Sequence, residues 1–352
     1  MLYIYFLISI LVTTCMFRFL INSDSVNHYL DLYDYPNNRK IHDKKILKIG
    51  GIVILFCWLL VLFVYRLLNQ EHILGINAAE LDLIMSGSFI FLGAILDDIV
   101  GINAPKKLFF QLISIFILIN SGYLFDLFNS YLLNIIVTTC LFILIINSMN
   151  LIDGIDGLSS SLFFLFSLFV ILSNNYLDIF SSKYLIICVI FLGSLLAFII
   201  FNFPPATVFL GDTGSQLLGW LAAVFVIQVS SNFILFSQKI YLLSVISLPF
   251  YDVFFVMIKR YLHFKGNLFG KIINIVKPDQ NHIHHLLLFV GYSPLKSMLI
   301  ITLFYLFCLC LSIIPILFKS FYLTTFVIVL VLNISFRLFF ERKLKLTNNQ
   351  VY

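Results

Sequence analysis

The chain has 352 residues, of which 61% are hydrophobic and only 11% are charged. A soluble domain carries about 25% charged residues, and no soluble core of this length could bury so much apolar surface. The composition therefore excludes an ordinary soluble protein and predicts an all-α polytopic membrane protein, with a single integral membrane domain over residues 1–352. The six cysteines lie in apolar runs without a CxxC pair, which argues against disulfides and thiolate metal sites.

Apolar segments of the length needed to cross a bilayer, about 20 residues, follow one another along the chain. The first lacks a basic region and a small-residue cleavage site, so we expect a retained span rather than a signal peptide. Between the ninth and tenth segments lies the longest polar loop, residues 261–295. We predict eleven transmembrane helices, near 1–21, 49–68, 80–96, 107–121, 131–149, 158–174, 183–202, 213–231, 239–260, 296–318 and 320–340.

The basic residues are distributed unevenly between the two sides that these segments define. With the N-terminus outside, 18 of the 22 Lys and Arg residues fall on the inner side and only 4 on the outer side. Because cytoplasmic loops are enriched in Lys and Arg, we expect the N-terminus outside and the C-terminus in the cytoplasm. The same parity puts every polar motif of the chain, and the loop 261–295, on the cytoplasmic face.

Two adjacent carboxylates, Asp97 and Asp98, end the third apolar segment. Acidic residues at a membrane boundary are costly and usually functional, although a pair of solvated helix-end acids is the alternative. Neighbouring helical residues point about 100° apart, so we expect the two to have different partners. Lys107, which begins the next segment one turn before Gln111, could hold a phosphate or extend its amine to the interface.

A second polar series recurs every three residues at the inner end of the fifth segment. Such neighbours lie on nearly one helical face, and two glycines allow the later members to turn toward a common centre. Amide and carboxylate oxygens are the ligands that Mg²⁺ prefers, whereas helix capping would explain only one or two of them. The series is Asn147, Asn150, Asp153 and Asp156.

Two further motifs complete the inner-face set. Asp212 lies in a Gly-Asp-Thr-Gly-Ser sequence at the expected start of a helix, where a carboxylate can cap the helix or bind a metal. His282, His284 and His285 lie in the long loop, with His282 and His285 on one expected helical face. Contact with phosphate suits these histidines better than zinc binding. The alternative is that they lie at the membrane interface without a functional role. Asp252, two turns from a helix end, is interpreted as a structural partner of Lys259 or of a neighbouring helix.

These residues indicate a chemistry. No Ser-His-Asp or Cys-His set and no GxxxxGK[ST] motif is present, which disfavours nucleophilic hydrolysis and ATP hydrolysis. Metal ligands together with cationic contacts suit transfer of a phosphorylated group, where positioning and charge neutralisation supply most of the catalysis.

Four motifs, in order and spacing, resemble the polyprenyl-phosphate N-acetylhexosamine-1-phosphate transferases of glycosyltransferase family 4. The similarity covers about residues 35–292, and the NxxNxxDGxDGL and GDxGSxxLG patterns are the most specific part of it. The motifs are DDIVGINAPKKLFFQ, NSMNLIDGIDGLSS, VFLGDTGSQLLG and NHIHHLLL.

The resemblance implies that a UDP-N-acetylhexosamine gives its sugar-1-phosphate to a polyprenyl phosphate, such as undecaprenyl phosphate, and releases UMP. It implies a bacterial inner-membrane enzyme with Mg²⁺ as cofactor, Mn²⁺ being a candidate substitute, and no nucleic-acid partner; it leaves a homodimer open. Asp212 and Asn150 would hold the metal. The catalytic candidates are Asp97, Asp98, Asp153 and Asp156, and the substrate-binding candidates are Lys107, Asn147, His282, His284 and His285.

The HIHHLLL sequence resembles the branch that starts O-antigen, common antigen or teichoic acid synthesis, so we expect UDP-N-acetylglucosamine as donor. The branch that transfers phospho-N-acetylmuramoyl-pentapeptide is the alternative within the family. A secondary transporter is the alternative from another class, but it would place acids near the bilayer midplane and show two similar halves. A non-catalytic membrane scaffold would leave the oxygen-rich motifs without a role.

Overall fold

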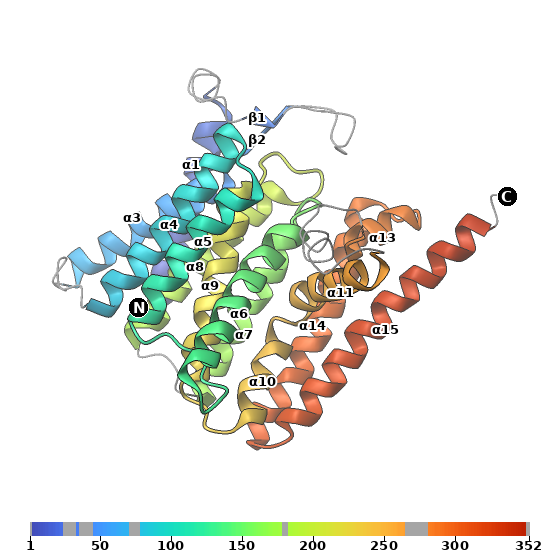
Figure 1. Ribbon diagram of the computed structural model, residues 1–352. Helices are drawn as coiled ribbons and strands as arrows, with labels where there is room; N and C mark the ends of the chain where they lie inside the picture. The colour runs from blue at the N-terminus through green and yellow to red at the C-terminus, as the bar shows by residue number, and fades with distance from the viewer. Residues whose placement is uncertain are drawn as a thin grey trace.

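The computed structural model of the chain describes residues 2–23, 33–34, 45–69, 78–177, 182–264 and 281–349. Within these ranges the chain forms helices and one two-stranded sheet (Figure 1). The elements are α1 (Leu2–Ile21), β1 (Tyr33–Asp34), β2 (Ile46–Leu47), α3 (Gly50–Leu68), α4 (Ala78–Val100), α5 (Ala104–Asn120), α6 (Tyr131–Ile152), α7 (Leu158–Leu177), α8 (Ser182–Asn202), α9 (Gly211–Ser230), α10 (Phe236–Val245), α11 (Ser247–His263), α13 (Ile283–Phe289), α14 (Pro294–Phe318) and α15 (Tyr322–Asn349).

The prediction of an all-α polytopic membrane protein is confirmed. Each predicted apolar segment coincides with a helix, or with the α10–α11 pair. In the described part of the chain, 8 helices are long and apolar enough to span a membrane, or 9 if α10 and α11 form one broken span. Two predicted spans are shorter: α5 has 17 residues, and the apolar part of α7 is Leu158–Asn174. The count of eleven and the orientation therefore stay predictions.

Some residues on which the orientation rests lie outside the described ranges, as do residues 265–280 of the predicted loop 261–295. They are Arg39, Lys40, Lys44, Lys265, Lys271 and Lys277.

Helix α9 is the central element of the bundle. It packs against α3, α4 and α6, and its side chains are buried along most of its length. Glycines permit this close packing: a Cβ at Gly51 of α3 would lie 2.1 Å from the backbone nitrogen of Gly214, and one at Gly219 would lie 2.6 Å from the Cα of Ile146. Helices that cannot rely on a hydrophobic force within lipid associate through such small-residue contacts.

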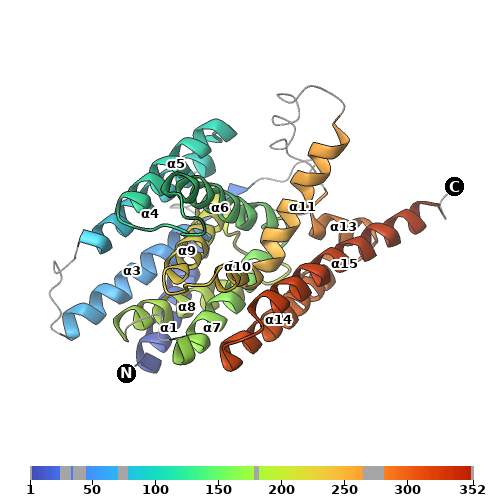
Figure 2. The same cartoon turned by 60° about the horizontal axis from the view of Figure 1, so that its bottom comes forward.

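The predicted ninth span is not one straight helix. Helices α10 and α11 meet at Ile246 with a bend of 94°. Pro249 lacks the N–H that would bond to the carbonyl of Val245, and this carbonyl instead accepts a hydrogen bond of 2.7 Å from the hydroxyl of Tyr305. The bend is therefore stabilised by α14, and α11 leads toward the histidine motif. Helices α14 and α15 lie side by side at the edge farthest from α1 and α3 in both views (Figure 1 and Figure 2).

A short backbone connection at one end of the bundle prepares the site. Strand β2 pairs antiparallel with β1, and Leu47 also forms a parallel bridge with Val208. The amides of Gly50 and Gly51 donate bonds of 2.9 Å to the carbonyls of Phe209 and Leu210. These bonds hold the start of α3 beside the start of α9.

Candidate active site

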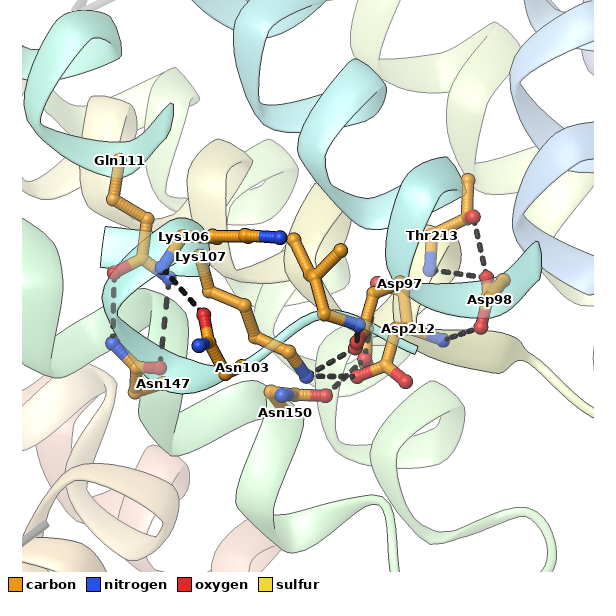
Figure 3. A network of polar contacts seen from close by, with 12 residues as sticks. Asp97, Asp98, Asn103, Lys106, Lys107, Gln111, Asn147, Asn150, Asp212 and Thr213 are labelled. Carbon is orange, nitrogen blue, oxygen red and sulfur yellow. Dashed lines mark hydrogen bonds and ion pairs between the residues drawn. The ribbon is translucent and has the colours of Figure 1, made fainter. Parts of the chain in front are cut away.

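The site is built around Lys107, at the first turn of α5. Its amine contacts Asp97, which lies near the end of α4, and is 3.4 Å from Oδ1 of Asp212, in the first turn of α9 (Figure 3). Asp97 Oδ1 also accepts a bond of 2.9 Å from the amide of Ile102, which orients the carboxylate. The three side chains therefore lie together, and Lys107 separates two carboxylates that would otherwise repel each other.

Asp98 has different partners from Asp97, as its position on the helix predicts. Its carboxylate accepts bonds of 2.9 and 2.8 Å from the amides of Asp212 and Thr213, and one from the Thr213 hydroxyl. Lys48 contributes its amine at 2.9 Å. Because Leu210, at the N-cap of α9, offers no capping side chain, Asp98 caps α9 from another helix.

The second polar series, Asn147 to Asp156, divides at the end of α6. Asn147 and Asn150 lie on the helix, Asp153 is its C-cap, and Asp156 lies in the turn that follows. Asn150 Oδ1 accepts a bond of 2.8 Å from the hydroxyl of Ser215, one turn after Asp212, so the amide lies beside the acid cluster.

Two members of the series make structural contacts. The Asn147 amide donates a bond of 3.0 Å to Gln111 Oε1, joining α6 to α5, and this contact occupies the side chain predicted to bind substrate. Asp156 Oδ2 accepts a bond of 3.0 Å from the amide of Ala206, which ties the turn after α6 to the segment before α9.

Asp153 lies in a strongly negative environment. Burial, and then the carboxylates of Asp212, Asp98 and Asp156, raise the pKa of Asp153 well above its ordinary value, while Lys48 acts in the opposite direction. Burial lowers the pKa of the Lys48 amine, but the nearby carboxylates, Asp98 above all, raise it by more. The net pKa of Lys48 is therefore raised, and the amine stays charged. The cluster thus places more carboxylates than cations at one end of the bundle.

The donor set fits a hard divalent cation. The group offers only oxygen ligands, from carboxylates and from Asn150, and it carries surplus negative charge. Among the described residues, no three His, Cys, Asp or Glu side chains are arranged to hold a metal by themselves. At phosphate-transfer sites Mg²⁺ is commonly held by one or two carboxylates, and the substrate phosphates complete its coordination.

The histidine motif adjoins the acid cluster. A Cβ at Gly154, between Asp153 and Asp156, would lie 2.1 Å from Nε2 of His284, so the ring packs directly on the backbone of that turn. Burial, followed by the neighbouring His285 and His282 rings, lowers the pKa of His284 well below that of free imidazole. His284 is therefore neutral at pH 7.

The helical-face argument for the histidines is wrong. Helix α13 begins at Ile283, and His282 is its N-cap in an extended conformation. His284 lies near both other rings, with centroid distances of 6.1 Å to His282 and 4.2 Å to His285. The extended N-cap at His282, rather than a shared face of α13, brings the three rings together.

Asp252 makes structural contacts, as interpreted from the sequence. Of the two alternatives, neighbouring elements rather than Lys259 supply its partners. Its Oδ2 is 2.9 Å from His282 Nδ1, and its Oδ1 accepts a bond of 2.6 Å from Arg337 of α15. Lys48 and Arg337 entered the sequence interpretation only as members of the inner-side charge set. Sequence spacing did not indicate a role for either residue, because each contacts a carboxylate that lies far away along the chain.

The fold and the site define a polytopic membrane protein whose carboxylates, lysine and histidines gather at helix ends suited to handling phosphate groups. The family model described as "Glycosyl transferase family 4" matches residues 81–230, which include Asp97, Lys107, Asn150 and Asp212. Over these residues the chain matches this family, and the comparisons support a glycosyl-1-phosphate transferase.

Bacterial relatives extend the similarity beyond the family model. The chain is 29% identical to the "Probable undecaprenyl-phosphate N-acetylglucosaminyl 1-phosphate transferase" of Bacillus subtilis, over 77% of this chain and 73% of the relative. It is 27% identical to the "Undecaprenyl-phosphate alpha-N-acetylglucosaminyl 1-phosphate transferase" of Escherichia coli K12, over 84% and 79%. For the "Decaprenyl-phosphate N-acetylglucosaminephosphotransferase" of Mycolicibacterium smegmatis the identity is 24%, over 76% and 71%.

Proposed function

We propose that the protein transfers N-acetylglucosamine-1-phosphate from UDP-N-acetylglucosamine to a polyprenyl phosphate and releases UMP. The observation that carries this proposal is the convergence of Asp97, Lys107, Asn150 and Asp212 from four helices at one end of an apolar bundle. A lipid phosphate can reach such a site from within the bilayer while a nucleotide sugar enters from water. The names of the relatives support the sugar and the lipid.

The residues support a direct role in phosphate chemistry. Lys107 can exchange its contacts with Asp97 and Asp212 for contacts with phosphate oxygens, and the developing charge is then neutralised in a partly dry site. Of the two adjacent acids, Asp98 is engaged by four donors, so we assign any proton acceptance from the acceptor phosphate to Asp97. The histidine motif packs beside the acids and is placed to contact the donor.

Mg²⁺ would be held by Asp212, together with Asn150, and would neutralise the diphosphate of the donor when bound. The all-oxygen donor set and the surplus of carboxylates support this choice. The position of the Lys and Arg residues supports a cytoplasmic site in the bacterial inner membrane: Lys48 and Lys107 contact the acids of the site, and Lys259 and Lys296 lie in the last turns of α11 and the first turn of α14.

The test uses purified protein in detergent with UDP-N-acetylglucosamine, undecaprenyl phosphate and Mg²⁺. UMP release should stop with EDTA and resume with excess Mg²⁺. Asp212→Asn should abolish release, whereas the matched variant Asp82→Asn should retain it, because Asp82 contacts Ser121 away from the site. Absence of UMP release with every UDP-hexosamine tried would overturn the proposal.

A further inference from the structure

Three charged or titratable side chains form a buried group behind the histidine motif. His282, Asp252 and Arg337 come from the start of α13, from α11 and from α15, and each side chain is only 4% exposed. Isolated buried charges are unfavourable, and an ion pair in such a place persists only when its hydrogen bonds are satisfied. The arrangement is therefore a specific constraint on the start of α13.

Every contact of Asp252 serves this constraint. One oxygen accepts bonds from Arg337 at 2.6 Å and from the amide of Ile283 at 3.0 Å, and the other lies 2.9 Å from His282 Nδ1. Arg337 in turn donates a bond of 2.6 Å to the carbonyl of Asn281, so the pair holds the backbone on both sides of His282.

This geometry fixes the orientation of the His282 ring. A carboxylate only accepts hydrogen bonds, so Nδ1 of His282 carries the hydrogen of the contact with Asp252. The second ring nitrogen, Nε2, is buried, and it forms no hydrogen bond with any described residue. A buried ring nitrogen without a partner is unfavourable unless a ligand supplies one.

The ring lies in the right place for such a ligand. It stacks on the His284 ring with an interplanar angle of 6°, and His284 packs on Gly154 in the turn that carries Asp153. The open nitrogen is therefore one ring away from the acid cluster. With Nδ1 engaged by Asp252, Nε2 is the ring nitrogen left to face a phosphate oxygen, and it donates there when it also carries a hydrogen.

We propose that Asp252 and Arg337 are positioning residues for the transfer reaction, which hold His282 so that Nε2 donates to a phosphate oxygen of the UDP-sugar. This inference rests on the proposed function and deepens it. Asp252 and Arg337 touch neither the substrates nor the acids; they act through the histidine ring.

The first test compares two substitutions of His282. An asparagine places its amide nitrogen near the position of Nδ1 and can keep the bond to Asp252, whereas a glutamine places its amide nitrogen near Nε2. His282→Asn should fold normally and lower kcat/KM for UDP-N-acetylglucosamine at least about tenfold, because a hydrogen bond to a charged group is lost. His282→Gln should retain more activity. The reverse order would show that only the contact with Asp252 matters and would overturn the inference.

The second test asks whether Asp252 acts through the ring. Asp252→Asn should raise KM for UDP-N-acetylglucosamine or lower kcat by about tenfold, while KM for undecaprenyl phosphate stays unchanged. In the His282→Asn background the same substitution should add almost nothing, since the nitrogen it positions is gone. Asp82→Asn serves as the matched control and should behave as wild type in both backgrounds.

The outcomes separate this inference from the proposed function. An inactive wild-type protein would contradict the function itself. An active wild type in which the Asp252 and His282 substitutions have fully additive effects would contradict only the positioning role. If Asp252→Asn does not fold, the comparison of the two His282 variants still decides the question, because it leaves the Asp252–Arg337 pair intact.

Discussion

Single side chains at this site have closely defined partners, and Lys107 shows this most directly. It lies between Asp97 and Asp212, while the neighbouring Lys106 is exposed. Both lysines belong to the same helical turn, so they form a matched pair. If the proposed function holds, a charge that contacts two carboxylates of the site should matter for the reaction, and an equal charge in water should not.

Lys107→Ala is expected to lower kcat/KM for UMP release at least about 100-fold, because a preorganised charge at a phosphate site is removed. Lys106→Ala should remain close to wild type. Steady-state UMP release with both substrates in detergent measures the difference. Equal losses in the two variants would show that Lys107 acts only through the overall charge of the surface.

His284 leads to a prediction of pH dependence. Its folded-state pKa lies well below the value of 6.5 for free imidazole. As the pH falls below about 6.5 the unfolded chain takes up a proton at this ring and the folded chain does not, so stability present above this pH is progressively lost. His284→Gln should therefore flatten the dependence of the unfolding free energy on pH between 7 and 5, as measured in detergent. An unchanged slope would contradict the burial of a neutral ring.

At the scale of helices, the junction between α4 and α9 decides where Asp212 lies. Asp98 satisfies the free amides at the start of α9 and pairs with Lys48, whose segment is held by the strand-like bridge to Val208. An acid that the sequence suggests as catalytic therefore also stabilises the fold. Its two roles can be separated by measuring stability and activity together.

Asp98→Asn is expected to lower the free energy of unfolding by about 3 kcal/mol, because it breaks a buried ion pair and weakens the cap. Thr213→Val removes only one hydroxyl contact and should cost about 1 kcal/mol. Chemical unfolding in detergent micelles gives both values. An Asp98→Asn protein of wild-type stability without activity would assign Asp98 to catalysis alone.

Across the whole molecule, the polar motifs lie at one end of the helices, and the loops at the other end have few basic residues. Asn103, before α5, is exposed at the site end, and Asn232, after α9, is exposed at the opposite end. The positive-inside rule then predicts that these two positions face opposite compartments.

This can be tested with single cysteines in a background that lacks the six native ones. Asn103→Cys should react with an impermeant maleimide only when the cytoplasmic side is accessible, and Asn232→Cys only from outside. Labelling of both from the same side would refute the predicted orientation, and with it the cytoplasmic site.

The sequence by itself determined the class of protein, the approximate positions of the helices and most of the residues that gather at the site. Apolar length and polar motifs are local properties, and the bilayer imposes helices on any segment that satisfies them. Asp97, Lys107, Asn150 and Asp212 were recognised in this way.

Only the tertiary structure decided what each residue contacts. The capping of α9 by Asp98, the bend at Ile246 and the Asp252–Arg337 support of His282 all join elements far apart in the chain. Such pairs produce no regular spacing in the sequence. The partner of a buried charge depends on which groups lie close to it in the folded bundle, away from water, and not on distance along the chain.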